Sequence, residues 1–155
     1  MNVRIFKADE ENIWRTFWQA YNEDDLAKVN KSLMEENWRK ILSDQSTLHA
    51  YWLQDDTGHP TGFVHFLMYE CTSAKTGCCY VEDLFVYPKH RQKGCARILM
   101  NAVFQSARDK LIEKVYWITR EQNKEAQYLY DQLAQKTDWI RYEVDLKVEE
   151  TDAKE

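Results

Sequence analysis

The sequence predicts an α/β (α+β) domain in which a mixed β-sheet carries helices on its faces. The chain has 155 residues, which suits a single domain. Short segments with alternating apolar residues are separated by longer segments with apolar residues at helical spacing. A strand–helix–strand order across residues 80–119 implies a crossover between parallel strands, whereas the segments before it imply antiparallel hairpins.

The first half of the chain predicts a strand, two helices and a hairpin. Residues 2–7 alternate as a short strand does. Asp9 begins a helix, because acidic side chains favour the positive end of the helix dipole. The apolar side of this helix is mostly aromatic: Ile13, Trp14, Phe17, Trp18 and Tyr21. The other elements of this half are a helix at 33–42, a strand at 47–53, a turn at 55–60 and a strand at 62–70.

The second half predicts two strand–helix units and a closing strand. In chain order these are a strand at 78–87, a helix at 92–110, a strand at 114–119, a helix at 123–135 and a strand at 139–148. The whole pattern predicts a central sheet of about six to seven strands flanked by about four helices. Residues 1–148 form a single domain, and residues 149–155 form a charged, frayed tail.

Composition narrows the class of protein. The net charge of −5 and the lack of a basic patch argue against a nucleic-acid partner. No segment approaches the run of about 20 apolar residues that spans a membrane. Because the first residues also lack a signal-peptide pattern, we expect a cytoplasmic protein with no membrane partner. In that compartment thiols are expected at all four cysteines, whose spacing does not suit zinc: Cys71, Cys78, Cys79 and Cys95.

A basic turn that contains a glycine leads from the strand at 78–87 into the next helix. Gly94 and the small Ala96 lie in the first helical turn, where a ligand can approach the backbone. The amides at a helix N-terminus and the helix dipole together bind anions. Further positive charge comes from Arg91, Lys93 and Arg97. This combination predicts a pyrophosphate-binding site.

The spacing Arg91-x-x-Gly94-x-Ala96 resembles the coenzyme A signature of the GNAT superfamily of N-acetyltransferases. Residues 80–86 resemble the polyamine and histone acetyltransferase-like branch, where a Glu-Asp pair precedes the end of the coenzyme-binding strand. Two later segments resemble the second half of the same family: residues 116–119, and the series Asn123-x-x-Ala126-x-x-Leu129-Tyr130. Two positions depart from the family pattern, since Gln92 and Ala96 stand where glycine is usual.

The resemblance implies a GNAT-type domain with a V-shaped split between its two central parallel strands. Acetyl-CoA would bind there as the cosubstrate, with no metal. The implied coenzyme-binding residues are Leu84, Phe85, Val86, Arg91, Gln92, Lys93, Gly94, Cys95, Ala96, Arg97, Asn123 and Ala126. The resemblance also implies a homodimer, for which the apolar stretch 139–146 is either the interface or a core strand.

Acetyl transfer to an amine needs a base and an acid. An alkylamine is protonated near pH 7 and must lose a proton before it attacks, while the departing thiolate must gain one. The family's acid is a tyrosine at the position of Tyr130, which follows Asn123 by seven residues and so shares its helix face. The other reading of Tyr130 is a packed core side chain. Tyr128 is the neighbouring alternative, but it points to another side of the helix.

Glu82 is the predicted base. Strand alternation puts Glu82 on one face with Leu84 and Val86, while Asp83 faces the other way. A backbone amide at Leu84 would then lie near the developing oxyanion. The alternative is a structural carboxylate that caps a neighbouring turn.

The acceptor is expected to enter over the first two helices and to be a small cationic amine, such as a polyamine or an amino acid-like molecule. Aromatic faces beside carboxylates suit an organic cation, although an aromatic stripe at helical spacing also forms a core. The candidate acceptor residues are Trp14, Trp18, Tyr21, Glu23, His65 and Glu82. We expect the amine to attack acetyl-CoA directly in a ternary complex.

Other functions stay open at this point. One is a protein acetyltransferase that acts on lysine or on an N-terminus. Another is a non-catalytic domain that senses acetyl-CoA, against which Tyr130 and Glu82 argue. A nucleotide-binding domain is disfavoured, because neither a Walker lysine nor a GxGxxG pattern follows the first strand.

Overall fold

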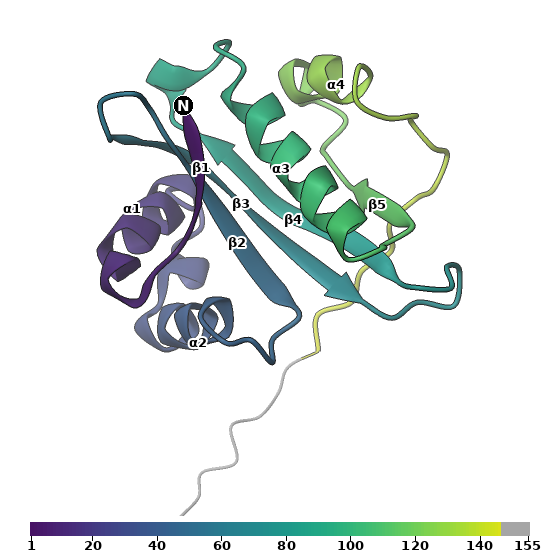
Figure 1. Ribbon diagram of the computed structural model, residues 1–155, viewed down its shortest axis with the longest axis horizontal. Coiled ribbons are helices and arrows are strands. Elements are labelled where there is room, and N and C mark those ends of the chain that lie inside the picture. The colour runs from purple at the N-terminus through teal and green to yellow at the C-terminus, as the bar shows by residue number, and fades with distance from the viewer. Residues whose placement is uncertain (147–155) are drawn as a thin grey trace, which may run out of the picture. The chain divides into compact units, whose positions relative to one another are not determined.

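A computed structural model describes residues 1–146 of the chain. It has two compact units, Met1–Arg120 and a second unit that begins at Glu121. The first unit holds a five-stranded sheet with helices on both faces (Figure 1). Its elements are β1 (Asn2–Ile5), α1 (Glu11–Tyr21), α2 (Lys31–Ile41), β2 (Leu48–Gln54), β3 (Pro60–Tyr69), β4 (Cys78–Val86), α3 (Cys95–Asp109) and β5 (Lys114–Trp117).

The strands of the first unit follow the order β1-β2-β3-β4-β5 across the sheet. The first three pairs are antiparallel, and β4 and β5 are parallel. The predicted mixed sheet, the hairpins and the crossover through α3 are therefore confirmed. The described residues hold five strands, fewer than the six to seven expected.

The closing strand predicted at 139–148 is absent from the described residues, and its last two residues lie outside them. Residues 139–146 carry large apolar side chains that face solvent, with Trp139 88% and Tyr142 91% exposed. The alternation of apolar and polar residues in this segment predicts only that one of its sides is apolar. A strand also needs the edge of another strand to pair with, and a sequence pattern does not supply one.

An aromatic core fills the space between the sheet and helices α1 and α2. Trp14 and Phe17 are completely buried, and Trp18 is 7% exposed. Helix α2 begins at Asn30, whose side-chain oxygen accepts a hydrogen bond from the Leu33 amide at 2.8 Å. The cluster consists of Phe6, Trp14, Phe17, Trp18, Met34, Trp38, Ala50, Trp52 and Phe63. The aromatic stripe of the first helix therefore contributes mainly to the core.

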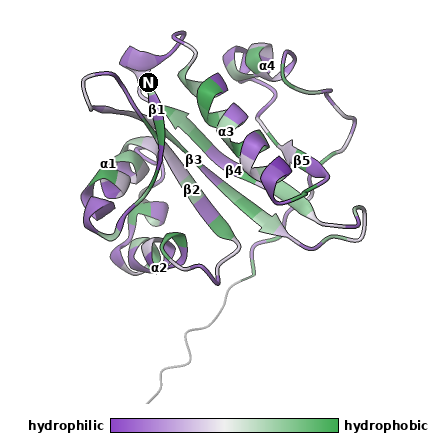
Figure 2. Cartoon of the chain, viewed as in Figure 1, coloured by the Kyte–Doolittle hydropathy of each residue, from purple (hydrophilic) through white to green (hydrophobic). Residues whose placement is uncertain are grey.

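Helix α3 covers the other face of the sheet (Figure 1). Its inner side is apolar and has no exposed surface at Leu99, Met100 and Val103. The helices α1, α2 and α3 each carry both hydrophobic and hydrophilic residues, as amphipathic helices do (Figure 2). Helix α3 begins at Cys95 and not at the predicted residue 92, because Gln92 and Gly94 have left-handed backbone conformations, with φ of 57° and 81°.

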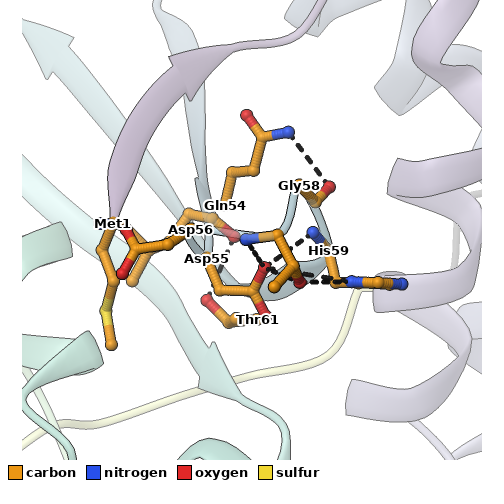
Figure 3. A network of polar contacts seen from close by, with 9 residues as sticks. Met1, Gln54, Asp55, Asp56, Gly58, His59 and Thr61 are labelled. Atoms are coloured by element: carbon orange, nitrogen blue, oxygen red, sulfur yellow. Dashed lines mark hydrogen bonds and ion pairs between the residues drawn. The ribbon is translucent and has the colours of Figure 1, made fainter.

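The turn between β2 and β3 is organised by the carboxylate of Asp55 (Figure 3). One oxygen of Asp55 accepts hydrogen bonds from the Thr57 hydroxyl at 2.7 Å, the Thr57 amide at 2.9 Å and the His59 amide at 2.9 Å. These bonds, above all the one from the Thr57 hydroxyl, lower the pKa of Asp55 to about 2. The side chain of Asp56 in the same turn pairs with the amino terminus of Met1.

A disulfide joins Cys71 and Cys78 across the loop that links β3 to β4. The expectation of thiols at all four cysteines is therefore wrong for this pair. The physical reason is the hairpin: Tyr69 pairs with Cys78, so Cys71 lies within 5.9 Å of Cys78 between Cα atoms. The free thiols are Cys79 and Cys95, both buried. Burial raises the pKa of Cys79 to about 11, so this thiol stays protonated at neutral pH.

The second unit contains helix α4 (Lys124–Tyr130). Asn123 caps it, since its side-chain oxygen accepts a hydrogen bond from the Ala126 amide at 3.2 Å. The predicted helix at 123–135 is confirmed in its first part, and hydrogen-bonded turns follow from Asp131 to Ala134. Within residues 1–146, none of the helices is both long enough and apolar enough to cross a membrane.

Candidate active site

A β-bulge in β4 is centred on Glu82. His65 of β3 pairs with Asp83, whereas the next residue, Phe66, pairs with Val81. Glu82 is therefore the extra residue of the bulge, which the register between β3 and β4 skips. Such a bulge bends its strand and shifts the alternation of its side chains.

The bulge changes which side chains share a face. Asp83 points toward α1, where its carboxylate contacts His65 at 3.0 Å, and Phe85 packs on Tyr21 on the same side. Glu82 also faces this side, because it lines a pocket with residues of α2. The prediction that Glu82 shares a face with Leu84 and opposes Asp83 is wrong, since simple alternation does not hold across the bulge.

The two parallel strands separate next to the bulge. Pairing between β4 and β5 runs from Cys78 with Lys114 to Val81 with Trp117. Strand β4 then continues to Val86, beyond the end of β5. On the side facing β5, the described residues of the first unit supply no strand partner for residues 82–86. The backbone groups along this edge suit a ligand that contains amides, such as the pantetheine arm of coenzyme A.

The turn before α3 has the properties expected of an anion site. Gly94 precedes the helix with φ of 81°, a conformation that favours glycine. A Cβ atom built at Gly94 would meet no protein atom within 4 Å, so the space in front of the backbone is open. The first helical turn leaves amides without acceptors in the helix, and its dipole favours a negative ligand. A pyrophosphate group therefore fits this turn.

The side chains around this turn differ in their positions. Arg91, Gln92 and Lys93 are exposed. Arg91 donates to the carbonyl of Val86 at 3.1 Å and thereby ties the turn to the end of β4. Cys95 is buried beside Met1, which leaves only its backbone for a ligand. Ala96 and Arg97 are half-buried in the first turn of α3.

An open pocket of about 590 Å³ lies on the α2 side of the bulge. Its lining includes Glu82 of β4 and, from the end of α2, Arg39 and Lys40. The remaining lining residues are Asn37, Ser43, Gln45, Ser46, Thr47, Leu48 and Leu67. The pocket thus combines a carboxylate with two cationic side chains.

The cations of this pocket share one carboxylate of α2. Glu36 accepts hydrogen bonds from Arg39 at 2.7 and 2.9 Å, and its oxygen lies 3.5 Å from the Lys40 ammonium group. The hydrogen bond from Arg39 is the main reason why the pKa of Glu36 falls to about 2. Arg39 and Lys40 carry two positive charges and Glu36 one negative charge, so this group at the end of α2 has a surplus of one positive charge.

Several predicted acceptor residues are buried away from this pocket's lining. Trp14 has no exposed surface and donates from its indole N–H to His65 Nε2 at 2.9 Å. His65 is 3% exposed and contacts Asp83. Trp18 donates to the carbonyl of Lys28 at 2.8 Å. Tyr21 is half-buried among aromatic rings, and Glu23 is exposed beyond the end of α1. Of the six candidates, only Glu82 lines the pocket.

The remaining predicted residues belong to the second unit. Asn123 is exposed and caps α4, while Ala126 and Tyr130 are half-buried. Burial raises the pKa of Tyr130 above its ordinary value. The phenol therefore keeps its proton at neutral pH, as a general acid must.

Two features of the site were not predicted. Arg39 and Lys40 occupy the last turn of a helix, where basic residues commonly complement the dipole, so nothing in their spacing indicated a pocket. The chain of hydrogen bonds from Trp14 through His65 to Asp83 joins residues far apart in the sequence. Only the register of the sheet brings them together.

The split sheet and the glycine-led helix N-terminus define a class of protein that binds a coenzyme with both amide and pyrophosphate groups. The chain belongs to the acetyltransferase (GNAT) family, whose sequence profile matches residues 11–134. It is 27% identical over 141 residues to the D-amino-acid N-acetyltransferase HPA3 of Saccharomyces cerevisiae. The matched region covers 90% of this chain and 88% of that protein. It is 34% identical over 71 residues to the thialysine N-epsilon-acetyltransferase of Caenorhabditis elegans, or 43% of this chain and 44% of the relative.

Solved structures confirm the fold. A probable acetyltransferase superposes with a TM-score of 0.81 at 16% identity, and the match covers 96% of this chain and 100% of the other. The aminoglycoside acetyltransferase AAC(6')-Iy, in complex with the bisubstrate analog CoA-S-monomethyl-acetylneamine, superposes with a TM-score of 0.79 at 19% identity, covering 94% of this chain and 98% of that one. The family and its relatives make the protein an acetyl-CoA-dependent N-acetyltransferase.

Proposed function

We propose that this N-acetyltransferase acetylates the amino group of a small acceptor that also carries a carboxylate, as amino acids do. The observation that supports the proposal most is the pocket in which Glu82 lies with Arg39 and Lys40. Glu82 attracts the ammonium group of the acceptor. The surplus positive charge beside Glu36 attracts its carboxylate. A polyamine, which carries only positive charge, would be repelled by Arg39 and Lys40.

The similar proteins agree with this acceptor class. The yeast relative is named for D-amino acids and the nematode relative for thialysine, which is also an amino acid. Both names describe acceptors with an amine and a carboxylate in one small molecule. The pocket therefore favours the amino acid-like acceptor over the polyamine.

In the proposed reaction the amine attacks acetyl-CoA directly in a ternary complex. Glu82 takes the proton of the ammonium group, directly or through water, and the neutral amine then attacks the thioester carbonyl. The carbon–sulfur bond then breaks, Tyr130 gives its phenolic proton to the departing thiolate, and the acetylated nitrogen releases its extra proton to water, from which Tyr130 is reprotonated. We assign the developing oxyanion to the amide of Leu84, in the part of β4 that extends beyond its pairing with β5.

The proposed binding of acetyl-CoA relies mostly on backbone groups. The edge of β4 at Leu84, Phe85 and Val86 pairs with the pantetheine amides. The turn and first helical turn from Arg91 to Arg97 hold the pyrophosphate, with open space in front of Gly94. Asn123 and Ala126, at the start of α4, complete the set taken from the family pattern.

Matched acceptors test the proposed specificity. Free thiol release from acetyl-CoA is followed with lysine and with cadaverine, which differ only by the carboxylate, and with spermidine. The D and L forms of several amino acids and a histone-tail peptide extend the panel. We expect kcat/KM to be highest for amino acids and lower for cadaverine and spermidine. Equal or better transfer to the polyamines would contradict the proposal, and preference for the peptide would favour a protein acetyltransferase.

We also propose that the chain forms a homodimer through residues 139–146. Five large apolar side chains in this stretch are at least 74% exposed: Trp139, Ile140, Tyr142, Val144 and Leu146. Large apolar side chains exposed within so short a stretch favour a protein–protein contact. Light scattering should give twice the chain mass for the wild type and one chain mass for a Tyr142→Glu/Val144→Glu variant. A monomeric wild type at micromolar concentration would exclude this dimer.

A further inference from the structure

We propose that Trp14, His65 and Asp83 form a buried positioning chain that holds the β4 bulge and so fixes the direction of Glu82. This inference rests on the proposed function, because it assigns Glu82 to the reaction. The three side chains come from α1, β3 and β4. The indole N–H of Trp14 lies 2.9 Å from His65 Nε2, and His65 Nδ1 lies 3.0 Å from the Asp83 carboxylate.

The chemistry of the groups fixes the direction of these hydrogen bonds. An indole N–H only donates, so His65 Nε2 must be the unprotonated acceptor. The proton of the neutral imidazole then resides on Nδ1 and is donated to Asp83. The chain therefore runs in one direction, from Trp14 through His65 to the carboxylate of Asp83.

The surroundings keep His65 in this orientation. His65 is 3% exposed, and the rings of Trp14, Trp18 and Phe63 lie against it, with centroids 4.8 to 6.3 Å away. Rotation of the imidazole would leave the indole donor of Trp14 without its acceptor in a buried site, which costs free energy. The direction of the Asp83 side chain is therefore tied to the aromatic core.

The hydrogen-bonded series Trp14–His65–Asp83 lies directly beside the bulge, and this position gives the series its role. His65 is the last residue of β3 before the register shift, and Asp83 directly follows Glu82. If the bulge moved by one residue, the neighbouring side chains would exchange faces. The bond from His65 to Asp83 holds Asp83 on the α1 side. The bulge is thereby confined to Glu82, whose side chain reaches the pocket.

None of the three residues lines the pocket, so each acts through Glu82 and the backbone beside it. A buried polar chain contributes little net stability compared with apolar packing, but when every group is paired it specifies one arrangement. We therefore expect its loss to affect catalysis more than folding. The coenzyme turn at Gly94 follows the end of β4 and makes none of these hydrogen bonds.

A pair of tryptophan variants tests this chain. Trp14→Phe removes the donor to His65, whereas Trp52→Phe removes a second buried indole of the same core, whose N–H has no hydrogen-bond partner among the described residues. The ring of Trp52 lies instead 5.0 Å from the Arg4 guanidinium. Trp14→Phe should lose more Tm than Trp52→Phe, because it leaves the buried His65 Nε2 without its donor, so kcat is compared at a temperature where both variants are folded. Only Trp14→Phe should lower kcat for the best acceptor, by at least about tenfold, because small misplacements of catalytic groups have such effects.

A pair of aspartate variants separates position from charge. Asp83→Asn keeps an oxygen that accepts from His65 Nδ1–H, while Asp83→Leu keeps the size and loses the acceptor. We expect Asn to retain most of the wild-type kcat and Leu to lose at least about tenfold. The Kd of acetyl-CoA, measured by calorimetry, should stay within about twofold in both. An unchanged kcat in Asp83→Leu, or equal losses in Trp14→Phe and Trp52→Phe, would overturn the proposal.

Nitrogen-15 NMR of labelled histidine gives a readout that does not depend on activity. The wild type should show His65 as a neutral imidazole with its proton on Nδ1, and Trp14→Phe should lose this fixed tautomer. A proton on Nε2 in the wild type would overturn the inference even if the enzyme is active. If no amine is acetylated, the proposed function fails, and the tautomer still tests the chain.

Discussion

The proposed coenzyme site and the proposed acceptor site, both built on β4, use different kinds of groups. The proposed coenzyme site consists of backbone groups: the edge of β4 beyond the end of β5 and the turn at Gly94. The proposed acceptor site consists of side chains in the pocket that Glu82, Arg39 and Lys40 line. Backbone sites depend on local conformation, which a short motif encodes. Side-chain sites depend on register and packing, so the sequence predicted the turn at Gly94 but not the pocket beside Glu82.

The largest effect is expected at the proposed acid. Tyr130→Phe removes the phenolic proton and should lower kcat by about 10²–10⁴-fold, the range for loss of general acid catalysis. Tyr128→Phe is the matched control, since Tyr128 lies two residues away in α4 and is 75% exposed. Stopped-flow or steady-state thiol release measures both. Equal activity of the two variants would remove Tyr130 from the mechanism.

The coenzyme side is sharpened by a pair of glycine variants. Gly94→Ala forces a side chain into a left-handed conformation, which costs about 1–2 kcal/mol, and places a methyl group in the open space before the turn. We expect the Kd of acetyl-CoA to rise about tenfold. Gly58→Ala in the β2–β3 turn carries a similar backbone strain at φ of 91°. It should lower Tm comparably and leave acetyl-CoA binding unchanged, as calorimetry and thermal melts will show.

The features that the sequence predicted are local ones, and those that it missed depend on contacts between distant segments. The Arg91-x-x-Gly94-x-Ala96 spacing led to the turn and to the family, because both are local. The pattern of side chains around Glu82 was misread, since an alternating strand was assumed where the structure has a bulge. The bond between Cys71 and Cys78 and the missing strand at 139–146 share this cause. Each depends on which segments become neighbours, and a linear pattern does not contain that information.

The acceptor side is probed by charge removal at the end of α2. Arg39→Gln or Lys40→Gln should raise KM for lysine by about three- to tenfold, because exposed ion pairs are weak, and should leave KM for cadaverine unchanged or lower. Lys31→Gln is the control, since Lys31 lies at the start of the same helix and does not line the pocket. A rise in KM for cadaverine equal to that for lysine would contradict a carboxylate site.

The smallest effect is expected in the β2–β3 turn, which belongs to neither side of the site. The pKa of Asp55 is lowered to about 2, so its carboxylate stabilises the fold above its ordinary pKa, and this contribution is lost as the pH falls toward 2. Asp55→Asn should therefore lower Tm slightly at pH 7 and progressively less below pH 4. Its kcat and acetyl-CoA Kd should match the wild type. A Tm difference that grows at low pH would contradict this account of the turn.

The most direct test of the division across β4 is Glu82→Gln with two readouts on one preparation. We expect kcat for the best amino acid acceptor to fall by about 10²–10⁴-fold, because the variant cannot take the proton of the ammonium group. The Kd of acetyl-CoA should remain within about twofold of the wild type, because the proposed coenzyme site consists of backbone groups and does not use the Glu82 side chain. A near-normal kcat, or a loss of acetyl-CoA binding as large as the loss of kcat, would contradict the account.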